Sequence, residues 1–104
     1  MLVVTTDTIA GQSISHPLGI VRGNVVRAKH IGKDIMASFR NVIGGEVDEY
    51  TSMIAGAREQ AYDRMIEHAK DMGADAIVGM RFTTSTVGQG QAEILAFGTA
   101  VKLA

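Results

Sequence analysis

The stretch VDEYTSMIAGAREQAYDRMIEHAKDM, residues 47–72, decides the fold of this 104-residue chain. It contains no proline, acidic residues lie near its start, and Gly73 follows it as a residue typical of helix ends. We therefore predict one long helix over Val47–Met72, about 39 Å long at 1.5 Å per residue. A helical wheel places one apolar stripe within about 60° of Tyr50. We expect that stripe to pack on a sheet, and its members are Tyr50, Ile54, Ala57, Ala61, Met65 and Met72.

Further apolar residues of the same helix lie outside this stripe. Isolated apolar residues on a surface are ordinary, but a domain of this size buries only about 65% of its unfolded surface, and exposed apolar patches mark interfaces. The pattern therefore favours contact with another chain. It leaves open whether that chain is a second copy or a different protein that docks on the exposed helix face. The candidate interface residues are Ala55, Tyr62, Ile66 and Ala69, with Met53 on the opposite flank.

Apolar and β-branched segments on both sides of the long helix predict strands. Gly23 and Asn24 interrupt the second of these segments, and Pro17 precedes it in a stretch that suits a loop or a sheet edge. Because the strands are grouped, the class is α+β: a small single domain over residues 1–104, with an antiparallel sheet packed by one long helix and one short helix. The predicted strands are Leu2–Thr6, Ile20–Ala28, Ala76–Thr86 and Ala92–Leu103, the last two forming a hairpin, and the short helix is Ile31–Ile43.

Charge and composition disfavour several classes of partner. Ten Lys and Arg oppose eleven Asp and Glu, a net charge of −1, so no basic field favours nucleic acid. No apolar run approaches the roughly 18 residues of a membrane span, and the chain has no cysteine for disulfides or thiolate metal sites. The N-terminal residues do not resemble a signal peptide, so the default expectation is a cytoplasmic protein without nucleic-acid or membrane partners.

Nothing in the sequence indicates an enzyme, and we name no catalytic or cofactor-binding residue. The segment from Gly88 has the GxG of a dinucleotide loop, but Glu93 stands at the third glycine position and a strand follows instead of a helix. Acidic residues recur at every fourth position from Glu59 to Asp71, and neighbouring Lys and Arg make a solvated face the simpler interpretation. If a metal binds, the candidate ligands are His16, His30, Glu67 and Asp71.

Several motifs, taken in order, resemble the YbjQ-like family of uncharacterised proteins, which is described as heavy-metal-binding. The resemblance covers essentially the whole chain. Its motifs are TTDTIAG (5–11), GNVVRAKHIGKDI (23–35), NVIGGEVDEYT (41–51), AREQA (57–61), GADAIVGMRF (73–82) and FGTAVKL (97–103).

The resemblance implies a cyclic homopentamer in which the long helix packs on its own sheet and on neighbouring subunits. The expected function is therefore an oligomeric structural or small-ligand-binding protein that self-assembles. One alternative is a metal-binding module that uses His or carboxylate ligands, since soft metals select thiolates and this chain has none. Five-fold symmetry would turn one such side chain into a ring of five ligands. The other alternative is a scaffold subunit whose helix face docks another protein.

Overall fold

A computed structural model describes residues 1–28, 48–88 and 90–104 of the chain. The predicted short helix over Ile31–Ile43 lies outside these residues. The elements follow the predicted order of two strands, a long helix and two strands. They are β1 (Leu2–Val3), β2 (Ile14–Ala28), α2 (Asp48–Asp71), β3 (Ala76–Gly88) and β4 (Gln91–Leu103).

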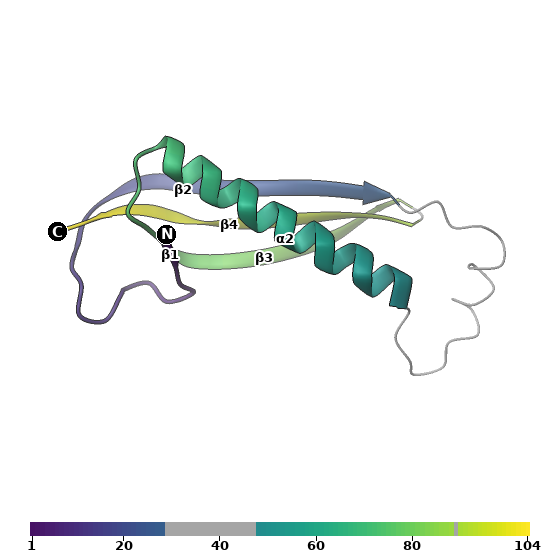
Figure 1. Cartoon of the computed structure of the whole chain (residues 1–104), viewed down its shortest axis with the longest axis horizontal. Coiled ribbons are helices and arrows are strands. Elements are labelled where there is room, and N and C mark those ends of the chain that lie inside the picture. The colour runs from purple at the N-terminus through teal and green to yellow at the C-terminus, as the bar shows by residue number, and fades with distance from the viewer. Residues whose placement is uncertain (29–47, 89) are drawn as a thin grey trace.

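The four strands form one sheet in the order β1-β3-β4-β2 (Figure 1). β4 lies between β2 and β3 and is antiparallel to both, so the predicted hairpin of β3 and β4 is confirmed. β1, however, is parallel to β3, with Leu2 opposite Ala76 and Val3 opposite Ile77. The prediction of an antiparallel sheet therefore holds for β2, β3 and β4 but not for β1, and the sheet of this α+β domain is mixed.

β2 begins at Ile14, six residues before the predicted start at Ile20. Pro17 lies inside this strand, which is possible because β2 is at the edge of the sheet, where a residue without an N–H donor need not break a hydrogen bond to a neighbouring strand. The register shifts on each side of Pro17 mark irregular pairing there. Of the two locations expected for Pro17, a loop or a sheet edge, the fold has the sheet edge.

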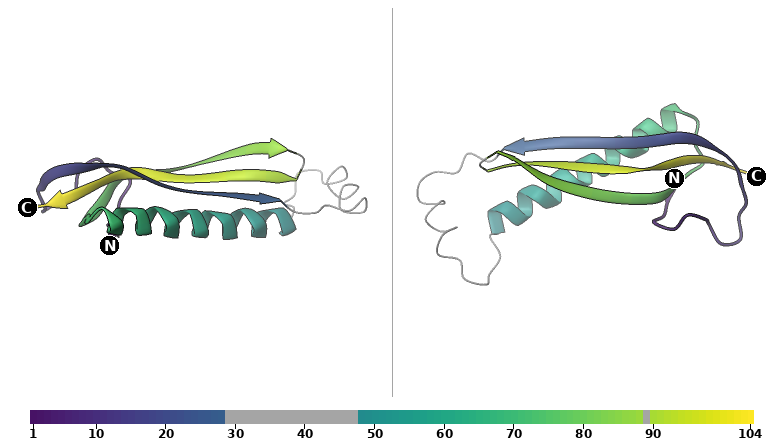
Figure 2. Two further views of the ribbon diagram at one scale, coloured as in Figure 1. Left: turned by 90° about the horizontal axis from the view of Figure 1, so that it is seen from above. Right: turned by 180° about the vertical axis from the view of Figure 1, so that it is seen from behind.

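The helix α2 packs on one face of the sheet, mainly over β2 and β4 (Figure 2). Ala57, Ala61 and Met65 of the predicted stripe are fully buried there, and Ile54 and Met72 pack against the same core. The wheel therefore identified the core-facing side of the helix correctly. The residues buried opposite the helix are Val21, Val25, Ile77, Met80, Ile94, Ala96 and Ala100.

A smaller cluster lies on the other face of the sheet, at the end where the chain starts. Ala76, Val78 and Val101 are buried there, because residues between β1 and β2 fold over them. Backbone hydrogen bonds fix this cover: Val4 N–H donates to the Ile77 carbonyl at 2.9 Å, and Met80 N–H donates to the Val4 carbonyl at 3.0 Å. Only this end of the second face is covered by described residues.

Candidate functional site

The rest of the second sheet face is an apolar surface that the described residues leave open. Side chains alternate between the faces of a strand, so the neighbours of the buried Val21 and Val25 point away from α2. Among them Ile20 is 71% exposed and Val26 is 57% exposed. On β4 the side chains in register with this set are partly buried: Thr99, Phe97, Leu95 and Glu93, opposite Ile20, Arg22, Asn24 and Val26.

The sequence pattern of the long helix did not predict this surface, which we call the open sheet face, because it lies on the strands. The signal was nevertheless present in β4. Ile94 and Ala96 point to the helix and are buried, whereas Leu95 and Phe97 alternate with them and point to the other side. A strand that is apolar on both faces is typical of a strand that is covered on both faces.

The helix residues predicted as an interface lie in different surroundings. Ala69 is fully buried in the chain's own core, and Tyr62 and Ile66 are half-buried with their packing directed to that same core. Ala55 is exposed and Met53 is partly exposed. The portion of this flank that remains accessible is therefore narrower than the helical wheel indicates. Ala69 is not accessible to another chain, because it packs in the core of its own subunit.

The predicted metal ligands do not come together in the described part of the chain. His16 is exposed on β2, where its Nδ1 lies 3.1 Å from Ser15 Oγ, and His30 lies outside the described residues. Glu67 pairs with Lys70 at 3.6 Å on the exposed side of α2, and Asp71 is also exposed. Within residues 1–28, 48–88 and 90–104, no three His, Asp or Glu side chains are grouped as metal ligands.

An open hollow of about 470 Å³ is lined by residues of α2. Two of its residues bond to the backbone of β2: Arg64 Nη1 donates to the Asn24 carbonyl at 2.7 Å, and His68 Nδ1 accepts from Arg22 N–H at 3.3 Å. These contacts attach the helix to the edge of the sheet and do not assemble a nucleophile, base and acid. The lining residues are Gln60, Asp63, Arg64, Glu67, His68 and Asp71.

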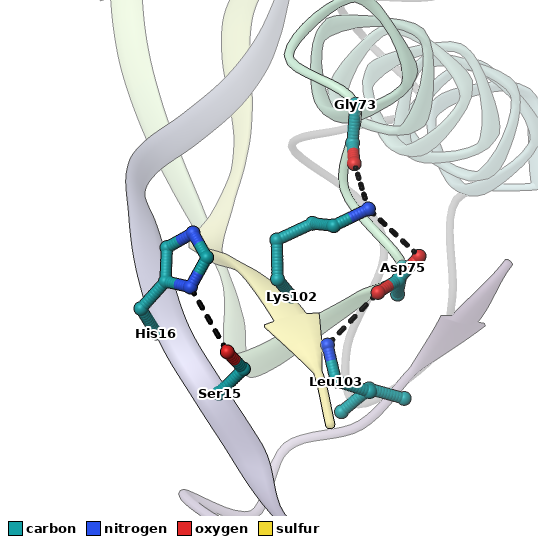
Figure 3. Close-up of polar contacts among 6 residues, drawn as sticks. All are labelled: Ser15, His16, Gly73, Asp75, Lys102 and Leu103. Atoms are coloured by element: carbon teal, nitrogen blue, oxygen red, sulfur yellow. Dashed lines mark hydrogen bonds and ion pairs between the residues drawn. The ribbon is translucent and has the colours of Figure 1, made fainter.

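A polar cluster joins the end of α2 to the last strand (Figure 3). Lys102 Nζ donates to the Gly73 carbonyl at 3.1 Å and to Asp75 Oδ1 at 3.3 Å. Asp75 Oδ2 accepts a hydrogen bond from Leu103 N–H at 2.8 Å. The Leu103 N–H and then the Lys102 ammonium favour the ionised carboxylate, so the pKa of Asp75 is lowered. This cluster is a structural clamp.

The lowered pKa of Asp75 predicts a pH-dependent contribution to stability. The ionised carboxylate is favoured in the folded chain, so its contribution is present above the unfolded pKa of about 3.8 and is lost as the pH falls below it. Asp75→Asn should therefore be less stable than the wild type at neutral pH, and the gap should close below about pH 3.8. Urea unfolding of both proteins from pH 7 to pH 2.5 measures the gap, and a gap that does not change with pH would contradict the assignment.

In the described part of the chain, α2 lacks the long apolar stretch that a membrane-spanning helix requires.

The comparisons with known proteins agree with this domain over its full length. The UPF0145 protein of Methanosarcina acetivorans is 57% identical, with 99% of this chain and 97% of the relative covered. The UPF0145 protein of Vibrio parahaemolyticus is 56% identical, with 99% and 98% covered. A crystal structure from Pediococcus pentosaceus, described as a protein of unknown function in the DUF74 family, matches with a TM-score of 0.64. That match is 15% identical and covers 100% of this chain and 98% of the other, so it supports the fold alone.

A family model with the description "Putative heavy-metal-binding" matches residues 1–104, the full chain. With two UPF0145 relatives more than half identical over nearly their whole length, the chain belongs to the YbjQ family of uncharacterised UPF0145 proteins.

Proposed function

We propose that this protein is the subunit of a homo-oligomeric ring that serves as a structural or small-ligand-binding assembly, without a catalytic role of its own. The observation that carries the proposal is the open sheet face, where Ile20 and Val26 are exposed and Phe97 and Leu95 are only half-buried. Exposed apolar surface of this kind is typical of interfaces.

The shape of the subunit supports the same proposal. The Cα radius of gyration is 17.3 Å, whereas a compact chain of about 100 residues has a radius near 13 Å. The helix α2 covers one face of the sheet (Figure 2). The central strand β4 is therefore covered on both faces only at the end where the residues between β1 and β2 lie over the second face. A neighbouring subunit on the open sheet face would complete the second layer that such a strand requires.

A ring is the assembly that fits two different surfaces on one chain. Contact between unlike surfaces repeats head to tail and closes when the rotation between copies allows it. In our proposal the open sheet face of one copy receives the accessible flank of α2 from the next, at Ala55, Tyr62 and Ile66. The family resemblance supports this arrangement and five copies, because it implies a long helix that packs on its own sheet and on its neighbours.

Ile20→Glu tests the open sheet face directly. Ile20 is 71% exposed, so glutamate there should leave the fold of the single chain intact while placing a charge in the apolar interface. We expect native mass spectrometry to show a ring for the wild type and loss of the ring for the variant. Ile20→Val, which keeps an apolar β-branched side chain, is the matched control and should keep the ring.

A wild-type mass of one chain would overturn the proposal outright. A ring that survives Ile20→Glu unchanged would show that the open sheet face is not the interface. Circular dichroism of both variants separates loss of assembly from loss of fold.

Metal binding is a second candidate, and the description of the family is the observation that favours it. Within residues 1–28, 48–88 and 90–104 no three-ligand cluster occurs in one chain, and a ring would repeat a single ligand side chain around its axis. The same native spectrum tests this candidate. Excess mass that a chelator removes would support it, and a ring with the bare chain mass after purification with zinc or nickel would exclude it.

A further inference from the structure

An arginine lies among the apolar side chains of the open sheet face. On β2, Gly23 lies against the helix and Val21 and Val25 are buried under it, so the residues that alternate with them point away from α2. Arg22 is therefore directed to the opposite side of the sheet from the helix, between two exposed apolar neighbours on the same strand. The residues of this outward set are Ile20, Arg22, Asn24 and Val26.

Two arginines lie beside the ring of Phe97, one on each neighbouring strand. Arg22 of β2 and Arg81 of β3 are both opposite Phe97 in the antiparallel registers of β4. They differ in what they already bind. Arg81 Nη1 donates to the carbonyls of Thr5 and Met80, each at 2.8 Å. The guanidinium of Arg22, in contrast, has no hydrogen-bond or ion-pair partner among the described residues, so it can bind a group from outside the chain.

Covering the open sheet face would take Arg22 out of water together with its apolar neighbours. A buried charge is strongly unfavourable unless an opposite charge is placed beside it. A surface that covers Ile20 and Val26 must therefore bring both apolar side chains and a carboxylate. An arginine and a carboxylate can form two parallel N–H···O bonds, which also fixes how the two surfaces are placed against each other.

The accessible flank of α2 has this composition. Glu59 lies four residues after Ala55 and three residues before Tyr62, so these three side chains share one side of the helix. Ile66 continues the same line, four residues after Tyr62. Glu59 is exposed, and neither of the ion pairs formed within the described ranges includes it. The flank is therefore an apolar stripe that contains a carboxylate.

We propose that Arg22 of one copy pairs with Glu59 of the next copy and thereby sets the position of the helix on the open sheet face. This inference rests on the proposed ring and deepens it, because it names the charged contact of the same interface. Opposite charges that are each surrounded by apolar residues favour a second copy of this chain as the occupant. In this arrangement the apolar residues on both sides of Glu59 cover the apolar residues on both sides of Arg22.

Within one chain Arg22 and Glu59 cannot meet, because the sheet lies between them. α2 packs on one face of the sheet (Figure 2), and Arg22 points out of the other face. Any coupling between these two residues therefore reports a contact between copies. Such a contact is compatible with a closed ring, since each chain gives Glu59 to one neighbour and Arg22 to the other.

Reversal of the two charges tests the pair. Arg22→Glu places a carboxylate opposite Glu59, and Glu59→Arg places a guanidinium opposite Arg22. We expect native mass spectrometry at one protein concentration to show loss of the ring in each single variant. The double variant Arg22→Glu/Glu59→Arg exchanges the two charges and should restore the ring mass. Both positions are exposed in the single chain, so circular dichroism of all variants should match the wild type.

The double variant Arg22→Glu/Asp63→Arg is the matched control. Asp63 follows Glu59 by one helical turn, is exposed, and lines the hollow beside α2. The two double variants have the same net charge, so a general effect of charge on assembly would act equally on both. We expect the ring to return with Glu59→Arg and to remain absent with Asp63→Arg.

The remaining outcomes separate the ion pair from the ring. A ring that Arg22→Glu leaves intact and Ile20→Glu removes would overturn the ion pair and leave the proposed ring standing. Loss of the ring in Arg22→Glu that Glu59→Arg does not reverse would also overturn the pair, because Arg22 would then contact a different group. A wild type of single chains would overturn the ring and the ion pair together, and a different protein would then be the occupant to seek.

Discussion

Replacing Gly23 with alanine is expected to lower the free energy of unfolding by about 3 kcal/mol, the upper end of the usual cost of overpacking a core. The reason is that β2 and α2 come closest at this glycine. An added Cβ would overlap the Ala61 carbonyl oxygen and lie 2.5 Å from the Met65 backbone nitrogen and 2.7 Å from Arg64 Cβ. The first two are helix backbone atoms, so the clash is relieved only if the whole of α2 moves away from the sheet.

Urea unfolding at fixed protein concentration measures this effect, and Gly56→Ala is its matched control. A Cβ at Gly56, in the middle of the same helix, would meet only Arg27 Nη1 at 3.5 Å. Alanine there should raise stability by about 0.5–1 kcal/mol, because glycine is a poor helix former. If Gly23→Ala unfolds at the wild-type urea concentration, the helix can lift from the sheet without cost and the close packing is not a determinant of the fold.

The sequence predicts the long helix and the side it buries because both depend on neighbouring residues. The end at Gly73 and the spacing of Ala57, Ala61 and Met65 are local features, and the structure has both. The hairpin of β3 and β4 is local in the same sense, because one short turn connects its strands. Such elements follow from periodicity and turn chemistry alone.

The features that the sequence could not predict depend on residues far apart in the chain. The parallel pairing of β1 with β3 joins Leu2 to Ala76, and no local pattern specifies it. Gly23 looked like an interruption of a strand, but its role is to let the helix approach, and this is visible only when Ala61 lies across from it. The open sheet face likewise depends on the register of β2 with β4, because that register determines which side chains of the two strands lie side by side on one face.

Met65→Ala is the second substitution for which we expect a large effect, a loss of about 2–5 kcal/mol in the free energy of unfolding. Met65 is among the largest fully buried side chains and is part of the core cluster between α2 and the sheet. Truncation removes its apolar contacts and leaves a cavity whose walls include helix backbone held next to Gly23, so collapse around the gap is restricted. For a domain of this size, each kcal/mol corresponds to a fall in Tm of roughly 4–8 °C.

Met72→Ala is the matched control for Met65→Ala, because Met72 is half-buried just beyond the end of α2 and packs at the margin of the same core. Its loss should be clearly smaller, since solvent and neighbouring side chains can fill the space that an accessible methionine leaves. Thermal unfolding of both variants at one protein concentration makes the comparison, because assembly itself raises apparent stability by mass action. Equal losses for the two methionines would mean that the helix is held by its end and not by its centre. That result would contradict the core described here, in which Ala57, Ala61 and Met65 fix α2 on the sheet.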